Sequence, residues 1–120
     1  MKLKSSEIKT YRSQQLGLQF NLCALCSEPI QDDAVLDHDH KTGLIRSVLH
    51  RGCNSMLGKV ENNMARNRMD RERLRKWAQN IVQYITKTHT NLVHPTFKTP
   101  EERKMKKAQG RGKGRKPPKR

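Results

Sequence analysis

Four side chains in the N-terminal half of the chain have the spacing of metal ligands. Two residues separate Cys23 from Cys26, and two residues separate His50 from Cys53. Two such pairs can aim four sulfur and nitrogen atoms at one ion, which is the ligand set of a tetrahedral structural zinc. Four protein ligands leave no open position for water, so we expect this zinc to stabilise the fold rather than to catalyse a reaction.

Other interpretations of these ligands stay open. Cys23 and Cys26 could be a redox pair or buried thiols, with His50 an ordinary histidine at the end of a strand. His89 or His94 could replace His50 as the fourth ligand if the chain folded back. A total of three cysteines argues against a closed disulfide framework, which leaves the thiols free to bind metal.

A second group of polar residues has the chemistry needed to hydrolyse a phosphodiester bond. Asp37, His38 and His40 follow an apolar run, and Asn54 comes directly after the last candidate zinc ligand. A histidine accepts a proton near neutral pH. Carboxylate and amide oxygens such as those of Asp37 and Asn54 suit a hard divalent ion, Mg²⁺ or Mn²⁺. The alternatives are a polar loop without chemistry and an Asn54 that only caps a helix.

The elements that must position these residues are short. Residues 34–38 and 44–49 are β-forming runs, and Gly43 is placed for a turn between them, which predicts a hairpin. Helical patterns cover about 6–16, 54–63 and 70–86. We therefore expect a mainly α fold with a small β-hairpin. It would consist of a zinc-stapled ββα core with an N-terminal helix (1–69), a helical packing or dimerisation segment (70–97) and a disordered basic tail (98–120).

Charge indicates the partner. The chain carries 26 Lys and Arg against 11 Asp and Glu, a formal net charge of +15, and the tail is its most basic part. Nucleic acid is the natural partner of such a chain. We expect no membrane contact and a cytoplasmic location, because no signal peptide and no apolar run of about 20 residues is present. The residues that we expect to contact DNA are Lys41, Arg46, Arg71, Arg75, Lys104 and Arg111.

The helix predicted at 70–86 has an apolar stripe. Leu74, Trp77, Ile81 and Tyr84 fall at the spacing of one helix face. The stripe could pack on its own domain or form the seam of a homodimer, and two heptads are too few to decide.

Several segments together resemble the recombination endonuclease VII family. They are Cys23-Ala-Leu-Cys26, Leu36-Asp-His-Asp-His40, Gly43-Leu-Ile-Arg46 and Leu49-x-x-x-Cys53-Asn54, and the similarity extends over about residues 7–97. Those phage enzymes are His-Me finger (ββα-metal, HNH-like) nucleases that cut branched DNA, including four-way Holliday junctions, as dimers.

The resemblance implies a role for each candidate residue. His38 would be the general base, His40 would assist at the scissile phosphate, and Asp37 and Asn54 would hold the divalent ion. It also implies the cytoplasm of an infected bacterium as the location. The chain departs from the family pattern at His50, where the family has cysteine, and at Leu57, where phage endonuclease VII has an acidic residue. It also has a short basic tail in place of a C-terminal domain.

Two competing functions stay open. A nicking or homing-type HNH endonuclease would use the same residues on duplex DNA. A non-catalytic zinc module would bind nucleic acid through the basic surfaces alone, and it would not need Asp37, His38 and Asn54.

Overall fold

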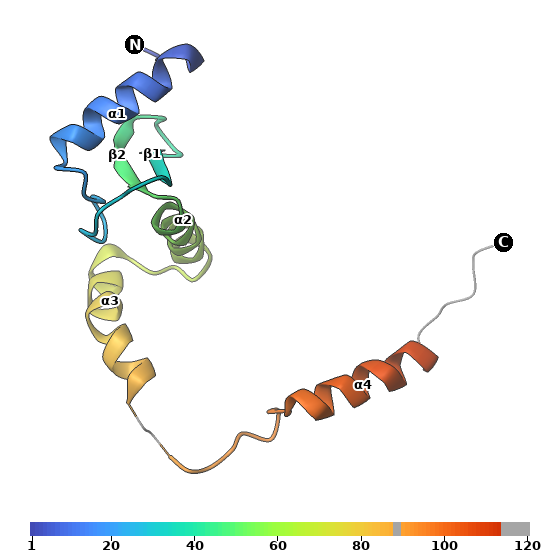
Figure 1. Ribbon diagram of the computed structural model, residues 1–120. Helices are drawn as coiled ribbons and strands as arrows, with labels where there is room; N and C mark the ends of the chain where they lie inside the picture. The colour runs from blue at the N-terminus through green and yellow to red at the C-terminus, as the bar shows by residue number, and fades with distance from the viewer. Residues whose placement is uncertain (88–89, 114–120) are drawn as a thin grey trace. The chain divides into compact units, whose positions relative to one another are not determined.

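The chain forms an N-terminal unit, Met1–Val82, and a C-terminal unit, Gln83–Arg120, and each is described by itself. The computed structural model describes residues 1–87 and 90–113, and for 111–113 it describes the backbone only. The elements, labelled in Figure 1, are a short 3-10 helix η1 (Ser5–Glu7), α1 (Ile8–Leu18), β1 (Ala34–His38), β2 (Ile45–His50), α2 (Arg51–Arg66), α3 (Arg71–Thr86) and α4 (Pro100–Lys113). The predicted fold class, mainly helical with one small hairpin, is confirmed.

The two strands form an antiparallel hairpin with one irregularity. Leu36 pairs with Val48 and His38 pairs with Ile45, so β2 holds one more residue than β1 between these pairs. The extra residue lies opposite Asp37 and re-aims the side chains of β2 there, as bulges do. The loop is closed by Asp39, whose carboxylate accepts hydrogen bonds from the backbone N–H of Lys41 at 2.7 Å and of Thr42 at 3.2 Å.

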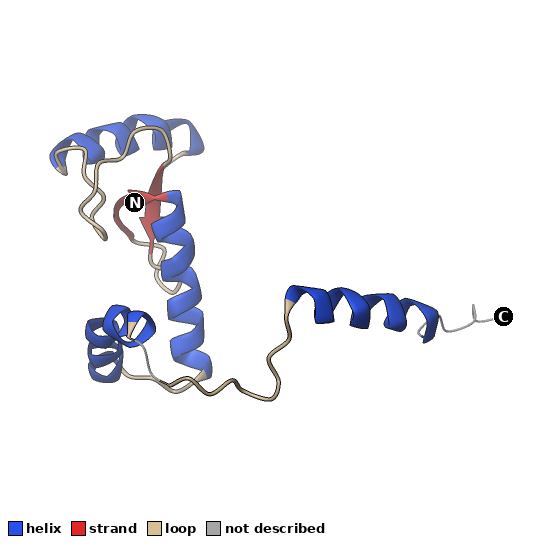
Figure 2. Ribbon diagram, turned by 60° about the horizontal axis from the view of Figure 1, so that its bottom comes forward, coloured by secondary structure: helices blue, strands red, loops and turns tan. Residues whose placement is uncertain are grey.

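The core of the N-terminal unit is small and surrounds the hairpin. Its buried side chains are Cys23, Ile30, Val48 and Leu49. Helices α1 and α2 both pack on the two strands (Figure 2), and α2 follows β2 directly, which completes a ββα arrangement. So few buried side chains supply little hydrophobic stabilisation, which makes a metal staple physically useful.

A polar side chain joins α1 to the hairpin. The Gln19 amide, just after α1, donates to the carbonyl of Val48 at 2.9 Å and accepts from the N–H of Val48 at 2.8 Å. It thereby pairs with the outer edge of β2 much as a neighbouring strand would. The sequence pattern predicted that this helix ends at about residue 16, but α1 continues to Leu18 and ends where Phe20 and Asn21 adopt positive φ.

Helix α2 begins earlier than the sequence pattern predicted. We expected it to open at Asn54, after a second metal-binding loop, but its first residue is Arg51 and His50 is the N-cap. His50 and Cys53 are therefore three positions apart on the first helical turn, where such side chains lie on one face. Asn54 lies inside the helix, so the alternative that it only caps the helix is wrong.

Most of the basic tail that we expected to be disordered is helical. Helix α4 covers Pro100–Lys113, where the sequence pattern predicted no regular structure. Thr99 caps it by accepting a hydrogen bond from the N–H of Glu102 at 3.2 Å, and Pro100 occupies the first helical position, which it favours. Lysine, arginine, glutamate and methionine are good helix formers, which a prediction from the low apolar content of the segment does not take into account. The expected disorder of 114–120 falls outside the described residues.

Among the described helices, none is both long enough and apolar enough to cross a lipid bilayer.

Candidate metal and active site

The four predicted zinc ligands lie together. The ligand atoms of Cys23, Cys26, His50 and Cys53 are all within 4.8 Å of one another. A tetrahedron with Zn–S bonds of about 2.3 Å has edges of about 3.8 Å, so a small contraction around an ion suffices. Cys23 is buried in the core, whereas Cys26 is exposed, so the cluster lies at the boundary between core and solvent.

Hydrogen bonds orient His50 toward the sulfur atoms. Its Nε2 lies 2.9 Å from the carbonyl of Pro29 and donates to it, so in the neutral ring that binds a metal Nδ1 keeps its lone pair. Nδ1 lies 3.3 Å from the Sγ of Cys26 and 3.8 Å from the Sγ of Cys53. A zinc-binding histidine usually donates its other ring nitrogen to a carbonyl or carboxylate in this way, which fixes its tautomer and the orientation of its ring.

The surroundings of Cys23 stabilise a thiolate. Burial by itself would raise the pKa of Cys23, but the backbone N–H groups of Cys26, His50 and Leu25 donate to its sulfur and lower the pKa to about 6. Burial and the neighbouring sulfur atoms raise the pKa of Cys53 to about 12. Crowded sulfur atoms that repel one another as thiolates are the donor set that a divalent cation neutralises.

These features fit a structural zinc ion bound by three cysteines and one histidine. The two ligand pairs come from the turn closed by the Cys23 N–H to Glu28 carbonyl bond and from the first turn of α2. His50 completes the cluster with the three cysteines, whereas the Nδ1 of His94 lies 2.7 Å from the hydroxyl of Thr96. His89 lies outside the described residues.

The proposed catalytic residues occupy the end of β1 and the loop that follows. Asp37 is 5% exposed, whereas His38 and His40 are exposed to solvent. The two imidazole rings are stacked, with centroids 4.9 Å apart and an angle of 21° between the ring planes. The end of β1 therefore buries the carboxylate of Asp37, while His38 on the strand and His40 in the loop are both exposed to solvent.

Asn54, the other proposed ligand of the divalent ion, lies on α2. It is half-buried on the helix that packs on both strands, one residue after the zinc ligand Cys53. Leu57, one turn later, packs against the core cluster. A zinc ion bound by this cluster would hold the start of α2, and Asn54 with it, against the hairpin.

Arg46 and Glu61 form an ion-pair network with Asp37 that the sequence did not predict. Arg46 was expected to contact DNA, but its guanidinium binds both oxygens of Asp37, at 2.6 and 3.2 Å, and both oxygens of Glu61, at 2.9 and 3.3 Å. Hydrogen bonds to Glu61 and Asp37 raise the pKa of Arg46 further above its ordinary value. Glu61 is the one acidic residue of α2 and follows Asn54 by about two helical turns. This spacing was the feature of the sequence that could have indicated that Glu61 lies near the site.

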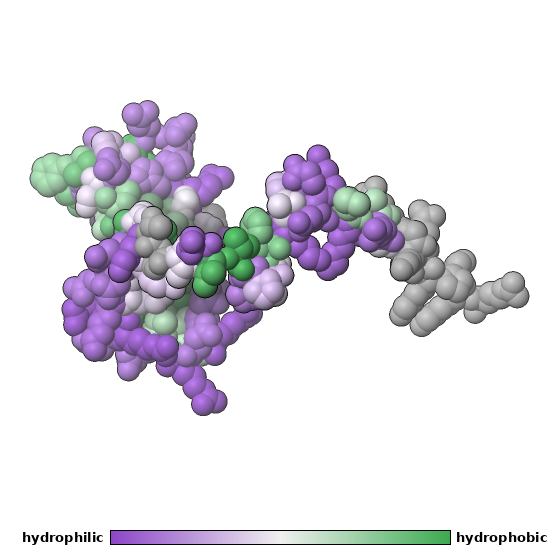
Figure 3. All heavy atoms as spheres, turned by 90° about the horizontal axis from the view of Figure 1, so that it is seen from below, coloured by the Kyte–Doolittle hydropathy of each residue, from purple (hydrophilic) through white to green (hydrophobic). Residues whose placement is uncertain are grey.

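The other residues expected to contact DNA differ in their surroundings. Lys41, Arg71 and Lys104 are exposed, and Arg75 forms an ion pair with Glu72. Arg111 belongs to α4, but its side chain is outside the described part of the chain. Hydrophilic residues cover most of the visible described surface in Figure 3, in keeping with the net charge of +15.

The fold and the site define a class of protein. A hairpin and helix in ββα order beside a Cys₃His cluster, with Asp37 and His38 at the end of the first strand, is the arrangement of a ββα-metal nuclease. The family model described as recombination endonuclease VII matches residues 2–87, so the chain belongs to the recombination endonuclease VII family. It is accordingly an endodeoxyribonuclease of a family that resolves Holliday junctions. A comparison with curated proteins finds no match.

Proposed function

We propose that this protein hydrolyses phosphodiester bonds in branched DNA such as four-way junctions, with His38 as the general base. The observation that carries the proposal is the contrast at the end of β1, where the exposed imidazole of His38 follows the buried carboxylate of Asp37. A base must reach the water that attacks the phosphate, whereas a metal ligand must be held in place.

The side chains present suit a divalent ion at this site. Asp37 already binds a cation, the guanidinium of Arg46, through both carboxylate oxygens, and Asn54 offers an amide oxygen from the helix that packs on the hairpin. These are the oxygen ligands that Mg²⁺ or Mn²⁺ takes. When bound, such an ion supplies Lewis acidity and steadies the leaving oxygen.

The two histidines have different tasks in this proposal. His38 accepts the proton of the attacking water, which requires its imidazole to be neutral near pH 7. His40, whose ring stacks on that of His38, assists at the scissile phosphate by donating a hydrogen bond to it. Neither ring is buried, so DNA can reach both.

A homodimer completes the proposal, with α3 as its seam. Trp77 and Ile85 of α3 are 48% and 69% exposed, so this helix leaves large apolar side chains in contact with water. Asp70 caps the start of this helix, because its carboxylate accepts a hydrogen bond from the N–H of Arg73 at 2.8 Å. A two-fold dimer would present two active sites, as the symmetric cutting of two strands requires.

The basic residues supply the affinity for DNA. Lys41 lies in the hairpin loop between the strands that carry the site, and Arg71 begins α3. Lys104 lies on α4. Phosphate contacts of this kind bind DNA without reading its sequence and weaken as salt rises.

The test is cleavage of a synthetic four-way junction beside a linear duplex of the same sequence and a supercoiled plasmid. Each substrate is incubated with Mg²⁺, without added divalent ion, and with the His38→Ala variant. Cutting of the junction that needs both Mg²⁺ and His38 supports the proposal. Equal or faster cutting of duplex or plasmid would instead make the protein a nicking or homing-type endonuclease. Binding of DNA without any cutting would favour the non-catalytic zinc module.

A further inference from the structure

One nitrogen atom of Arg46 bonds to two carboxylates from different elements. Its Nη2 lies 3.2 Å from Oδ1 of Asp37 on β1 and 2.9 Å from Oε1 of Glu61 on α2. The remaining guanidinium nitrogens complete both pairs, with Nε 2.6 Å from Oδ2 of Asp37 and Nη1 3.3 Å from Oε2 of Glu61. Two carboxylates therefore converge on one cation beside the proposed active site.

The fold holds these three side chains at one place. The extra residue of β2 lies opposite Asp37, and Arg46 is part of that irregular segment. Glu61 follows Asn54 by seven positions, which is about two helical turns, so both lie on the same face of α2. Helix α2 packs on both strands, so this face carries Glu61 to the hairpin.

The charges at this place do not balance. Two carboxylates contribute two negative charges, whereas the guanidinium contributes one positive charge. A divalent ion would neutralise both carboxylates, and oxygen atoms are the ligands that Mg²⁺ and Mn²⁺ prefer. Asp37 is buried, which strengthens the need for full compensation because a buried charge lacks water.

We propose that Asp37 and Glu61 form a cation-exchange site, which binds the guanidinium of Arg46 without a divalent ion and releases it when the ion binds. The released guanidinium, which is 35% exposed and whose planar fork suits a phosphate, then binds the DNA backbone next to the site. Glu61 is in this way a further ligand for the ion, and Arg46 is a positioning residue. The inference rests on the proposed function, in which Asp37 holds the divalent ion.

The ion exchange is tested by titrating Mn²⁺ into the zinc-loaded full-length protein without DNA and measuring free Mn²⁺ by electron paramagnetic resonance. Glu61→Gln should weaken Mn²⁺ binding by about 10- to 100-fold, the range seen when partners of a metal site are removed. Glu72→Gln is the matched control, because Glu72 forms an equivalent bidentate pair with Arg75 on α3, and it should leave binding unchanged. Wild-type affinity in Glu61→Gln would overturn the proposal.

Arg46→Gln separates exchange from a purely structural ion pair. If Arg46 competes with the ion, this variant should bind Mn²⁺ more tightly than the wild type. Unchanged or weaker binding would overturn the exchange. The substitution leaves Asp37 buried without its partner and can prevent folding, so Arg46→Lys is measured beside it. Lysine keeps the positive charge but lacks the planar guanidinium that binds both carboxylates. The Arg46→Lys variant should therefore also bind Mn²⁺ more tightly than the wild type, and unchanged or weaker binding would overturn the exchange.

The release of Arg46 toward DNA is tested by the salt dependence of binding in a His38→Ala background, which prevents cutting. With Mg²⁺, adding Arg46→Gln should reduce the slope of log affinity against log salt by about 1, as for one lost phosphate contact. Without added divalent ion it should leave the slope unchanged. An equal change in both conditions would mean that Arg46 contacts DNA regardless of the ion, which would overturn the release.

The outcomes distinguish this inference from the proposed function. If the wild type cuts DNA with Mg²⁺ while Glu61→Gln binds Mn²⁺ normally, the cation-exchange site is wrong and the nuclease assignment of His38 stands. If the wild type cuts no substrate although the titrations behave as described, the proposed function is wrong and the exchange site remains as a binding site.

Discussion

Charged side chains near the hairpin and charged side chains along α4 are held differently. At the hairpin, Asp37 and Glu61 both bind Arg46, and Asp39 accepts two backbone hydrogen bonds. Along α4, the side chains described for 100–110 are all exposed to solvent. At the hairpin, hydrogen bonds hold each charged group in a defined position. Along α4, the exposed side chains provide a high density of charge without a defined position for each group.

This difference corresponds to two kinds of task. Proton transfer and metal binding require groups held within about 0.5 Å of a productive geometry, and a zinc cluster beside the strands supplies that rigidity. Attraction to a phosphate backbone depends on the number of positive charges and tolerates movement. These different tasks explain why the few buried side chains surround the hairpin and why the side chains described for α4 are all exposed.

The zinc cluster gives the strongest test of the contrast. Removing the ion with a chelator should unfold the hairpin, because structural zinc binds with about 10–16 kcal/mol and a whole domain is stable by only about 5–15 kcal/mol. Amide signals of the N-terminal unit should collapse in nuclear magnetic resonance spectra. Signals of the C-terminal unit, which contains none of the four ligands, should keep their positions.

A ligand variant makes the same test without a chelator in excess. Cys26→Ser changes an exposed side chain, so its effect reports on metal binding rather than on core packing. The variant should unfold at a much lower chelator concentration than the wild type, and Ser55→Ala, an exposed change on α2, should not. Equal chelator resistance in both variants would remove Cys26 from the ligand set.

The two histidines at the end of β1 should differ in their effect on rate. His38→Ala should lower the single-turnover cleavage rate by about 10²- to 10⁴-fold, the usual contribution of a general base, with DNA binding retained. His40→Ala should cost less, because a group that assists the phosphate does not take the proton. A larger loss in His40→Ala would exchange the two roles.

The exposed face of α3 should have an intermediate effect, on assembly rather than on chemistry. Trp77→Ala should weaken the homodimer by about 2 kcal/mol or more, as buried interface tryptophans do, which sedimentation at several concentrations would measure. Gln79→Ala changes the opposite face of the same helix and should leave the dimer intact. If the wild type sediments as a monomer at all concentrations, α3 has another partner.

Local spacing carried most of what the sequence could predict. Two Cys/His pairs and the Asp37-His38 dipeptide each depend on residues close together in the chain, so residue spacing alone was enough to predict the metal cluster and the hairpin. Spacing carried only part of the Arg46 network, because it places Glu61 on the same face of α2 as Asn54 but does not indicate the irregular strand pairing around Arg46. No single residue type marks such a bulge in a sequence.

Helix α4 was missed for a different physical reason. A segment of lysine, arginine and glutamate has too few apolar side chains to form a core, which favours disorder, yet the same residues have high helix propensity. The capping residue Thr99 and the first-turn acids Glu101 and Glu102 were visible in the sequence and outweigh the lack of a core.

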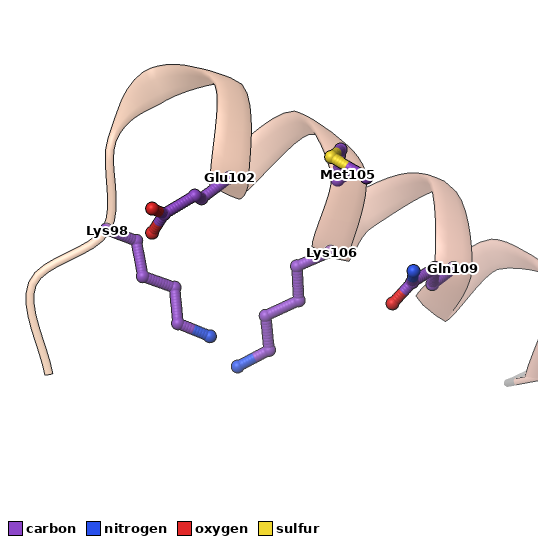
Figure 4. Close-up of a pocket in the computed structure, with 5 residues that line it drawn as sticks. All are labelled: Lys98, Glu102, Met105, Lys106 and Gln109. Atoms are coloured by element: carbon purple, nitrogen blue, oxygen red, sulfur yellow. The ribbon is translucent and has the colours of Figure 1, made fainter.

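The smallest expected effect is on α4. Lys98 and Lys106 point their amino groups into the same hollow beside this helix (Figure 4), and the nearby Lys106 lowers the pKa of Lys98. A DNA phosphate between them would relieve this repulsion, so Lys106→Gln should weaken DNA binding several-fold at low salt and reduce the salt slope by about 1. Lys104→Gln removes one charge elsewhere on α4 and should weaken binding less, with the position of cutting unchanged in both variants. Equal losses in the two variants would mean that α4 acts only through its total charge, whereas the hairpin depends on the position of each charged group.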